Sequence, residues 1–199
     1  RGGSKGLPGK NIKELCGKPL IAWSINAGLK SKYLDEIIVS TDYKNIADIA
    51  KKHGASIPFL RPDDLASDTT TSFDTVKHAI DYYGNELNRE FDYVVLLEPT
   101  SPLREDSDID NAIEKLFNSS ADSIVGISKT EDQNPAFLVN KDNKDFLAGY
   151  TNKNMKVLRR QDVEDVYFME GTIYISKVNV LLDEKTFYHK NTIGYEVPK

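Results

Sequence analysis

Cysteine is nearly absent from this 199-residue chain, in which Cys16 is the only one. An intrachain disulfide framework and a four-cysteine zinc site are therefore excluded. Long hydrophobic runs are missing too, because no stretch reaches the roughly eighteen consecutive apolar residues of a membrane-spanning helix. The sequence accordingly predicts no membrane partner, and its single thiol fits the reducing environment of the cytoplasm.

Basic charge is also in short supply. The chain has 26 Lys and Arg against 31 Asp and Glu, for a formal net charge of −5. A nucleic-acid-binding protein generally carries a basic field, so nucleic acid is not an expected partner. Because the net charge is negative, any site for an anion must be formed by a local group of basic residues. The histidines, His53, His78 and His189, lie far apart in the sequence and do not have the spacing of a metal site.

Helical and strand patterns alternate along the first two thirds of the chain. Apolar residues at helical spacing predict helices at 19–31, 43–54, 72–87 and 107–117. Short β-branched runs predict strands at 35–41, at the start of 92–104, and at 121–128, 167–177 and 191–199. Such alternation is typical of an α/β domain with a mostly parallel sheet covered by helices. We expect a single domain over 1–199, interrupted at about 130–165 by a polar, weakly patterned arm.

The chain opens with "RGGSKGLPGKN", a loop rich in glycine and basic residues. Glycine lets backbone N–H groups converge on an anion, and lysine or arginine supplies the charge that phosphate needs. The loop is not a Walker A motif, because Gly9 and Lys10 are followed by Asn11 and preceded by Ser4 where that motif has glycine. Ser4 also breaks the dinucleotide fingerprint. We interpret the loop as a phosphate cradle of another kind.

Several longer motifs carry a specific resemblance. They are the opening loop followed by "GKPLIAWSI", then "FLRPDDLASDTTTS", "LLEPTSPLR" and "RRQDVEDVYFMEGTIYI", in this order. Together they resemble the acylneuraminate cytidylyltransferases, the family of CMP-sialic acid synthetases with their legionaminic and pseudaminic acid relatives. The resemblance implies a Rossmann-like, three-layer nucleotide-diphospho-sugar transferase fold with a dimerisation arm, and hence a homodimer. It also implies a first strand before Arg1 and an aspartate-rich, metal-binding segment after Lys199.

The reaction that the resemblance implies is transfer of CMP from CTP to the anomeric hydroxyl of a sialic-acid-like, nine-carbon 2-keto sugar acid, with release of pyrophosphate. Its nucleotide-binding residues would be Arg1, Gly2, Gly3, Ser4, Lys5, Lys10, Asn11, Arg61 and Ser72, of which Arg1, Lys10 and Asn11 would be catalytic. Its sugar-binding residues would be Glu98, Thr100, Ser101, Arg104, Arg160, Gln161, Phe168 and Glu170. Mg²⁺ or Mn²⁺ is the expected cofactor, with Glu98 as a ligand.

Several of these residues also have ordinary structural interpretations. Arg61 could read a base edge or pair with Asp63 or Asp64. Ser72 could bind the ribose or cap the helix that follows it. Glu98 could bind metal or sugar, or pair with Arg104, and Arg160 could engage the sugar carboxylate or stay solvated. Cys16 is expected to pack rather than act as a nucleophile, since no partner base is apparent.

Three positions depart from the family pattern. Glu98 stands where glutamine is common, Phe168 where arginine is common, and Glu170 where asparagine is common. A carboxylate and an aromatic ring favour a di-N-acyl, deoxy sugar such as legionaminic or pseudaminic acid over N-acetylneuraminic acid. The alternatives are a nucleotidyltransferase for Kdo or a sugar 1-phosphate, and a nucleotide-binding homologue that has lost catalysis.

Overall fold

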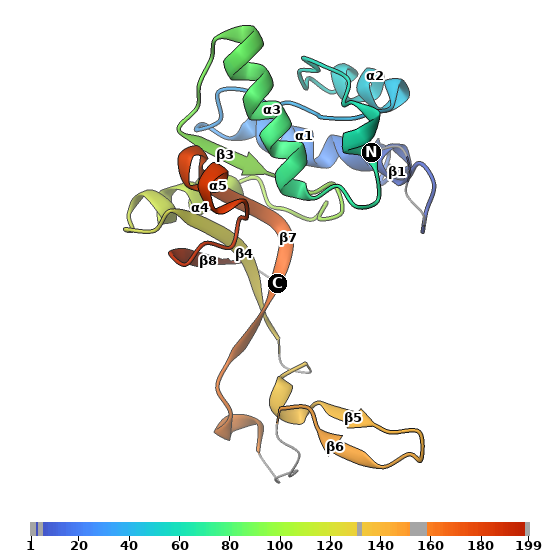
Figure 1. Ribbon diagram of the computed structural model, residues 1–199, viewed down its shortest axis with the longest axis vertical. Helices are drawn as coiled ribbons and strands as arrows, with labels where there is room; N and C mark the ends of the chain where they lie inside the picture. Colours follow the sequence, from blue (N-terminus) through green and yellow to red (C-terminus); the bar gives the residue numbers. More distant parts are fainter. Residues whose placement is uncertain (1–2, 4–5, 131–132, 152–158, 198–199) are drawn as a thin grey trace. The chain divides into compact units, whose positions relative to one another are not determined.

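The computed structural model describes residues 3, 6–130, 133–151 and 159–197 (Figure 1). The chain divides into two compact units. The first comprises Arg1–Gly126 and Gly171–Tyr195, and the second comprises Ile127–Glu170 and Glu196–Lys199.

The helices of the first unit follow the apolar periodicity of the sequence. They are α1 (Leu20–Lys30), α2 (Lys44–Lys52), α3 (Ser72–Leu87), α4 (Asp108–Phe117) and α5 (Val178–Glu184). The predictions for α1 to α4 are confirmed to within two residues at each end, whereas α5 was not predicted. One core cluster joins Ile21 and Ile25 of α1 to Ile46 of α2. The helix α2 ends at Lys52, and Gly54 follows two residues later with φ of 95°, the left-handed conformation that glycine adopts without strain.

A four-stranded sheet has the order β3-β7-β4-β8. Its strands are β3 (Tyr93–Leu96), β4 (Ser123–Thr130), β7 (Val166–Lys177) and β8 (Thr192–Glu196). The α/β prediction is confirmed, but the sheet is mixed: β3 and β7 run antiparallel, with Val94 opposite Ser176. The chain enters β7 from the second unit and not from a crossover helix, so it is free to return in the opposite direction.

The strand predicted at 35–41 is reduced to an isolated parallel bridge between Ile38 and Ser56. The amide of Val39 donates to Ser56 O at 3.0 Å, and the amide of Ser56 donates to Ile37 O at 2.8 Å. The backbone is thus paired on one side over a short stretch only. The prediction of a full strand is wrong for this structure, because strand ladders need pairing partners that a local pattern does not supply.

A two-residue turn near the N-terminus was also not predicted. The short strands β1 (Glu14–Leu15) and β2 (Lys18–Pro19) pair antiparallel around Cys16 and Gly17. Both turn residues have positive φ, of 51° and 78° respectively. Cys16 is exposed, so the expectation that it packs is wrong. The turn conformation points its side chain to solvent.

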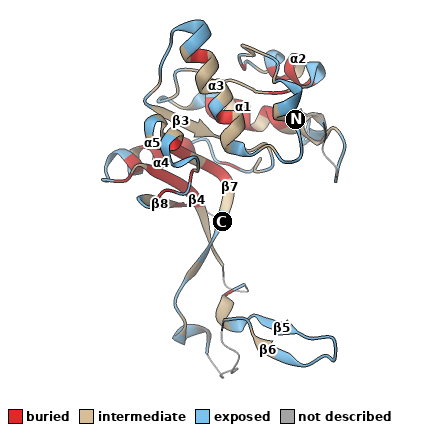
Figure 2. Ribbon diagram, in the orientation of Figure 1, coloured by how far each residue is buried: buried red, intermediate tan, exposed pale blue. Residues whose placement is uncertain are grey.

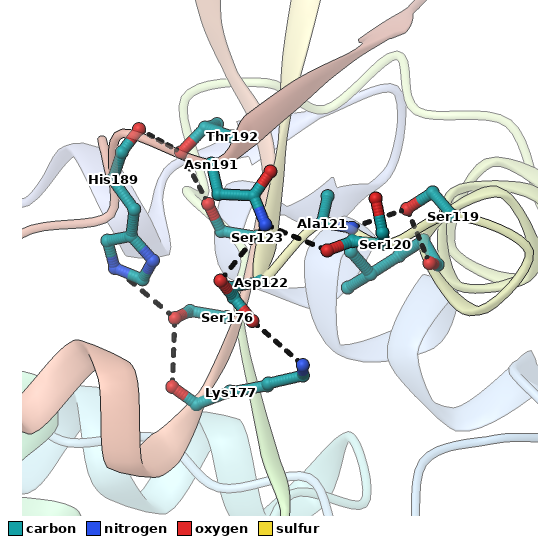
Figure 3. Close-up of polar contacts among 11 residues, drawn as sticks. Ser119, Ser120, Ala121, Asp122, Ser123, Ser176, Lys177, His189, Asn191 and Thr192 are labelled. Carbon is teal, nitrogen blue, oxygen red and sulfur yellow. Dashed lines mark hydrogen bonds and ion pairs between the residues drawn. The ribbon is translucent and has the colours of Figure 1, made fainter.

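Polar contacts tie the ends of three sheet strands together (Figure 3). Lys177 Nζ lies 2.8 Å from Asp122 Oδ1, and the side-chain Nδ2 of Asn191 donates to Asp122 Oδ2 at 3.1 Å. The hydrogen bond from Lys177 lowers the pKa of Asp122. Ser123 and Thr192 share a hydrogen bond of 2.6 Å between their hydroxyls. This cluster fixes the register at one end of the sheet.

The second unit is built on irregular chain and a hairpin. The hairpin strands β5 (Val139–Lys141) and β6 (Leu147–Gly149) pair antiparallel. They are preceded by the 3-10 turn η3 (Pro135–Phe137), which Asn134 caps by accepting from the amide of Ala136 at 3.0 Å. Figure 2 shows that buried residues concentrate on β4, β7 and the helices of the first unit, whereas this hairpin is mostly exposed.

No helix within the described ranges has the length and apolar character needed to cross a lipid bilayer.

Candidate functional site

The opening loop leads into the 3-10 turn η1 (Lys10–Ile12). Gly9 precedes it with φ of 66°, so glycine here lets the chain turn without strain. Lys10 and Asn11 are half-buried on this turn, and Gly3 is exposed. The predicted residues Arg1, Gly2, Ser4 and Lys5 lie outside the described residues. The turn therefore presents Lys10 and Asn11 from a fixed piece of backbone directly before α1.

Arg61 is held at the end of the segment 35–41. Its backbone amide donates to Thr41 O at 2.8 Å, and its Nε donates to Ser40 Oγ at 3.0 Å. A second guanidinium nitrogen donates to Ser40 O. The side chain is half-buried. Arg61 is thus oriented by Ser40, a contact that the sequence did not suggest.

Ser72 is the first residue of α3, but the cap of this helix is Thr71. The Thr71 hydroxyl accepts from the amide of Asp74 at 3.1 Å, and the amide of Thr71 donates back to Asp74 Oδ2 at 2.9 Å. This is a reciprocal capping box. The capping interpretation of Ser72 is wrong, because its neighbour performs that role. Ser72 is exposed at the helix start, and its predicted contact with ribose stays a prediction.

The loop that leaves β3 carries Glu98, Thr100 and Ser101. Thr100 Oγ1 donates to Glu98 Oε2 at 3.2 Å, and the amide of Ser101 donates to Glu98 O at 3.2 Å. The hydroxyl of Ser24 on α1 donates to the same carbonyl at 3.2 Å. Glu98 is half-buried, and its carboxylate lies directly over Gly171 of β7. The three predicted sugar-binding residues therefore form one cluster.

Arg104 ends this loop and is buried. Its Nε donates to Thr172 O at 2.8 Å, and a terminal nitrogen donates to the same carbonyl. Weaker contacts reach Glu98 O at 3.4 Å and Ser24 Oγ at 3.3 Å. Desolvation lowers the pKa of Arg104 to about 10, although the charges of Asp108 and Glu98 oppose the shift. The guanidinium stays charged at neutral pH and fastens the loop to β7 through backbone carbonyls.

A cavity of about 620 Å³ lies within the first unit. Its lining includes residues 33–41, residues 90–97 and residues of α1 and α3. Asn11 and Arg61 both border it, as do Ser24 and Pro99 beside Glu98. The cavity thus brings residues from the opening loop, from the segment after 35–41 and from the β3 loop to one region.

The remaining predicted residues belong to the second unit. Arg160 and Gln161 lie in the 3-10 turn η4 (Arg160–Asp162), where Gln161 is exposed and the side chain of Arg160 is outside the described part. Phe168 is exposed on β7. Glu170, two residues further on, accepts a hydrogen bond from the hydroxyl of Ser128.

The donor set for a divalent cation is sparse. Within the described ranges, no group of three or more His, Cys, Asp or Glu is arranged to hold a metal ion. Glu98 offers one carboxylate, whose Oε2 already accepts a hydrogen bond from the hydroxyl of Thr100. Mg²⁺ commonly takes one or two protein carboxylates and completes its shell with substrate phosphates and water. Glu98 therefore fits as one ligand of such an ion, and a complete protein cage is not present in this part of the chain.

Sequence reasoning missed Ser24, Ser40 and Gly171. The two serines gave no signal, because their roles depend on residues far away in the sequence. Gly171 did give one: an isolated glycine within a strand pattern commonly marks a close approach of another group.

Comparison with known proteins settles the family. The sequence pattern of the family described as Cytidylyltransferase matches residues 1–196. This chain belongs to the cytidylyltransferase family. The cytidylyltransferase chain is 38% identical over 198 residues to a CMP-N,N'-diacetyllegionaminic acid synthase of Legionella pneumophila, covering 96% of this chain and 81% of that protein.

Two further relatives cover the whole of the cytidylyltransferase chain. An N-acylneuraminate cytidylyltransferase of Streptococcus agalactiae is 36% identical, and the chain spans 47% of its length. A pseudaminic acid cytidylyltransferase of Campylobacter jejuni is 33% identical, with 84% of its length covered. Among solved structures, a CMP:2-keto-3-deoxy-manno-octonic acid synthetase complexed with CTP has a TM-score of 0.70 at 16% identity, covering 98% of this chain and 86% of that one. This last likeness supports the nucleotidyltransferase fold.

Proposed function

We propose that this protein transfers CMP from CTP to the anomeric hydroxyl of a nine-carbon 2-keto sugar acid and releases pyrophosphate. The proposal rests on sequence similarity over essentially the whole chain to relatives named for legionaminic, acylneuraminic and pseudaminic acids. The cluster of Glu98, Thr100 and Ser101 supports it, because the cluster lies on a loop at the end of a strand, where open α/β sheets bind ligands.

The nucleotide end of the site would be formed by the opening loop and Arg61. Attack on the α-phosphorus needs charge neutralised on phosphate oxygens and an in-line geometry more than it needs a protein nucleophile. Lys10 would neutralise the β- and γ-phosphates, and Asn11 would donate to the α-phosphate. Arg1 and Lys5 would add charge from the same loop. Arg61, oriented by Ser40, would read the base edge.

The sugar end would be formed by the loop after β3. An ionised carboxylate accepts hydrogen bonds and cannot donate them, so Glu98 would accept from a hydroxyl or an amide of the sugar. We propose a di-N-acyl, deoxy sugar acid as the preferred acceptor. Support for this preference comes from the relatives that are named for diacetyllegionaminic and pseudaminic acids.

We propose Mg²⁺, or Mn²⁺ in its place, as the cofactor, with Glu98 as one ligand. When bound, the ion would offset negative charge on the phosphates. We also propose a homodimer formed through the second unit and a cytoplasmic location. Support for the dimer comes from the large apolar side chains that the second unit exposes, which are Phe137, Leu138, Val139, Phe146, Leu147, Tyr150, Tyr167, Phe168 and Met169.

We propose that an extended apolar segment preceding Arg1 occupies the cavity between residues 33–41 and β3. Within the described sheet β3 is an edge strand that pairs with β7 alone, and both Ile38 and the residues of β3 line the cavity. Buried backbone groups need partners, and a strand would supply them to both segments. A form of the protein extended before Arg1 by such a segment should show slowed amide exchange at Ile38 and Val95. Unchanged exchange at both amides would contradict the proposal.

The direct test of function is pyrophosphate release by the full-length protein with CTP, Mg²⁺ and a panel of acceptors. We expect release with legionaminic or pseudaminic acid, and a lower kcat/KM with N-acetylneuraminic acid. If N-acetylneuraminic acid matches or exceeds the deoxy sugars, the sugar preference is wrong but the reaction stands. If only Kdo or a sugar 1-phosphate is used, the acceptor class is wrong. No release with any acceptor would contradict catalysis itself.

A further inference from the structure

Gly171 of β7 lies in unusually close contact with the carboxylate of Glu98. A Cβ atom placed on Gly171 would lie 2.6 Å from Glu98 Oε2 and 3.0 Å from Glu98 Cδ, with Ser101 Oγ at 3.5 Å. Carbon and oxygen atoms that are not bonded do not approach to 2.6 Å, so a side chain at this position would displace the carboxylate. Gly171 is not in a left-handed conformation, so its backbone does not itself require glycine.

The backbone on both sides of this contact is held by one residue. Arg104 donates to the carbonyl of Thr172, the residue after Gly171, at 2.8 Å. It also reaches the carbonyl of Glu98 at 3.4 Å. Ser24 donates to the same Glu98 carbonyl at 3.2 Å. Because the main chain of Glu98 and that of Thr172 are tied to one guanidinium, the loop cannot easily lift away from β7. A displaced carboxylate would have to move by rotation of the Glu98 side chain.

We propose that Gly171 is a positioning residue for the sugar acid: its missing side chain sets where the Glu98 carboxylate lies. The inference rests on the proposed function, and within it on the role of Glu98 as acceptor of a hydrogen bond from the sugar, not on its role as a ligand of the metal ion. Thr100 Oγ1, at 3.2 Å from Glu98 Oε2, holds one carboxylate oxygen near the glycine. The other oxygen is then available to the sugar. Arg104 takes part as the anchor of the loop, and not as a group that contacts the sugar.

The chain offers a matched control in the same sheet. Gly126 of β4 also lacks a left-handed backbone, and a Cβ there would meet the amide nitrogen of Ile173 and Thr172 Cβ at 3.4 Å. That spacing is tight, but no residue of the Glu98 loop is involved. Gly171→Ala and Gly126→Ala therefore make the same chemical change in neighbouring strands, and only the first disturbs the carboxylate.

The experiment measures kcat and KM for the sugar acid and for CTP in the full-length enzyme, with thermal unfolding of each variant. Misplacement of a positioning group by about 1 Å can cost about 100-fold in rate. We expect Gly171→Ala to lower kcat/KM for the sugar acid by about 10- to 100-fold and to change KM for CTP by less than about threefold. We expect Gly126→Ala to leave the KM for the sugar acid within about twofold of the parent.

A second substitution separates positioning from general damage. Glu98→Asp removes one methylene and withdraws the carboxylate from the contact with a new Cβ. It should lower activity in the parent background, yet raise kcat/KM for the sugar acid when added to Gly171→Ala. Equal losses for CTP and sugar acid in Gly171→Ala, no loss at all, or no gain from Glu98→Asp in that background would each overturn the inference. A parent enzyme that transfers CMP to no acceptor would instead overturn the proposed function.

Discussion

Among the described residues, Lys10 has the main role in the proposed binding of the CTP triphosphate. It is half-buried on η1, where the backbone is held by hydrogen bonds from the amide of Lys10 to Leu7 O at 3.1 Å and from the amide of Ile12 to Gly9 O at 3.0 Å. A charge presented from a fixed turn is already oriented before the ligand arrives. This is the arrangement in which electrostatic stabilisation of a transition state is most effective.

Lys10→Ala should therefore cost about 2–4 kcal/mol of transition-state stabilisation, seen as a lower kcat/KM for CTP. Lys13→Ala is the matched control, because Lys13 is an exposed lysine directly after the same turn. We expect the control to retain nearly the activity of the parent. An unchanged kcat/KM for CTP in Lys10→Ala would show that this lysine has no such role.

Glu36 gives a residue-scale prediction about pH. Burial tends to raise the pKa of this carboxyl, but hydrogen bonds from Tyr83 and Arg89 outweigh burial, so the net shift is downward. Tyr83 OH donates to Glu36 Oε1 at 2.6 Å. A carboxyl with a lowered pKa in the folded state stabilises the protein above its unfolded pKa of about 4.3, and that contribution is lost as the pH falls through the folded pKa.

Glu36→Gln should lower stability at pH 7 and should flatten the loss of stability on going from pH 5 to pH 3. Urea unfolding at several pH values measures both effects. Glu86→Gln, at an exposed carboxylate on α3, serves as the control and should follow the parent closely. If the parent and Glu36→Gln lose stability in parallel below pH 5, the network does not lower the pKa of Glu36.

The cap of α3 gives a prediction at the scale of an element. The reciprocal bonds between Thr71 and Asp74 satisfy amides that the first turn of the helix leaves without partners. Thr71→Ala should lower the free energy of unfolding by about 1 kcal/mol, whereas Thr71→Ser, which keeps the hydroxyl, should cost much less. Chemical denaturation of the two variants at pH 7 measures this. Equal effects of the two substitutions would show that the hydroxyl is not the cap.

The elements differ in how far the sequence could predict them. The helices α1 to α4 were predicted because each buries one periodic apolar face. The segment 35–41 was overpredicted as a strand, because its pairing depends on residues elsewhere in the chain. The hairpin of β5 and β6 was missed because each of its strands is only 3 residues long and therefore too short to show an alternating pattern. The antiparallel return of β7 could not be predicted, since direction in a sheet follows from topology.

The candidate site shows the same division. The motif resemblance placed Lys10, Asn11 and Glu98 in the site, and the structure positions these residues next to helices or strand ends. The motif resemblance did not indicate that Arg104 would be buried. An arginine within a motif is usually interpreted as a ligand-binding residue. Here Arg104 donates to backbone carbonyls, and a sequence pattern does not show which backbone carbonyls will lie near a side chain. Ser40 and Ser24 were missed for the same reason.

At the scale of the whole molecule, the exposed apolar side chains of the second unit favour association of two protein chains. Its exposed apolar residues include Phe146, which is 69% exposed. Large apolar side chains gathered on a small unit commonly mark an interface. We expect a dimeric mass by light scattering at micromolar concentration, and a shift toward the monomer in Phe146→Glu.

Tyr43→Glu is the control for that measurement, because Tyr43 is 56% exposed but belongs to the first unit. It should leave the dimer intact. A monomeric parent at micromolar concentration would contradict the proposed association.

In the proposed reaction the α-phosphorus of CTP becomes bonded to the anomeric oxygen of the sugar acid. The most direct test follows the phosphorus itself, using the full-length protein, Mg²⁺, a di-N-acyl deoxy sugar acid, and CTP labelled at either the α- or the γ-phosphate. We expect the α-label in a CMP-sugar and the γ-label in pyrophosphate, in equal amounts. A γ-label found on the sugar, or an α-label that remains in CTP or free CMP, would contradict it.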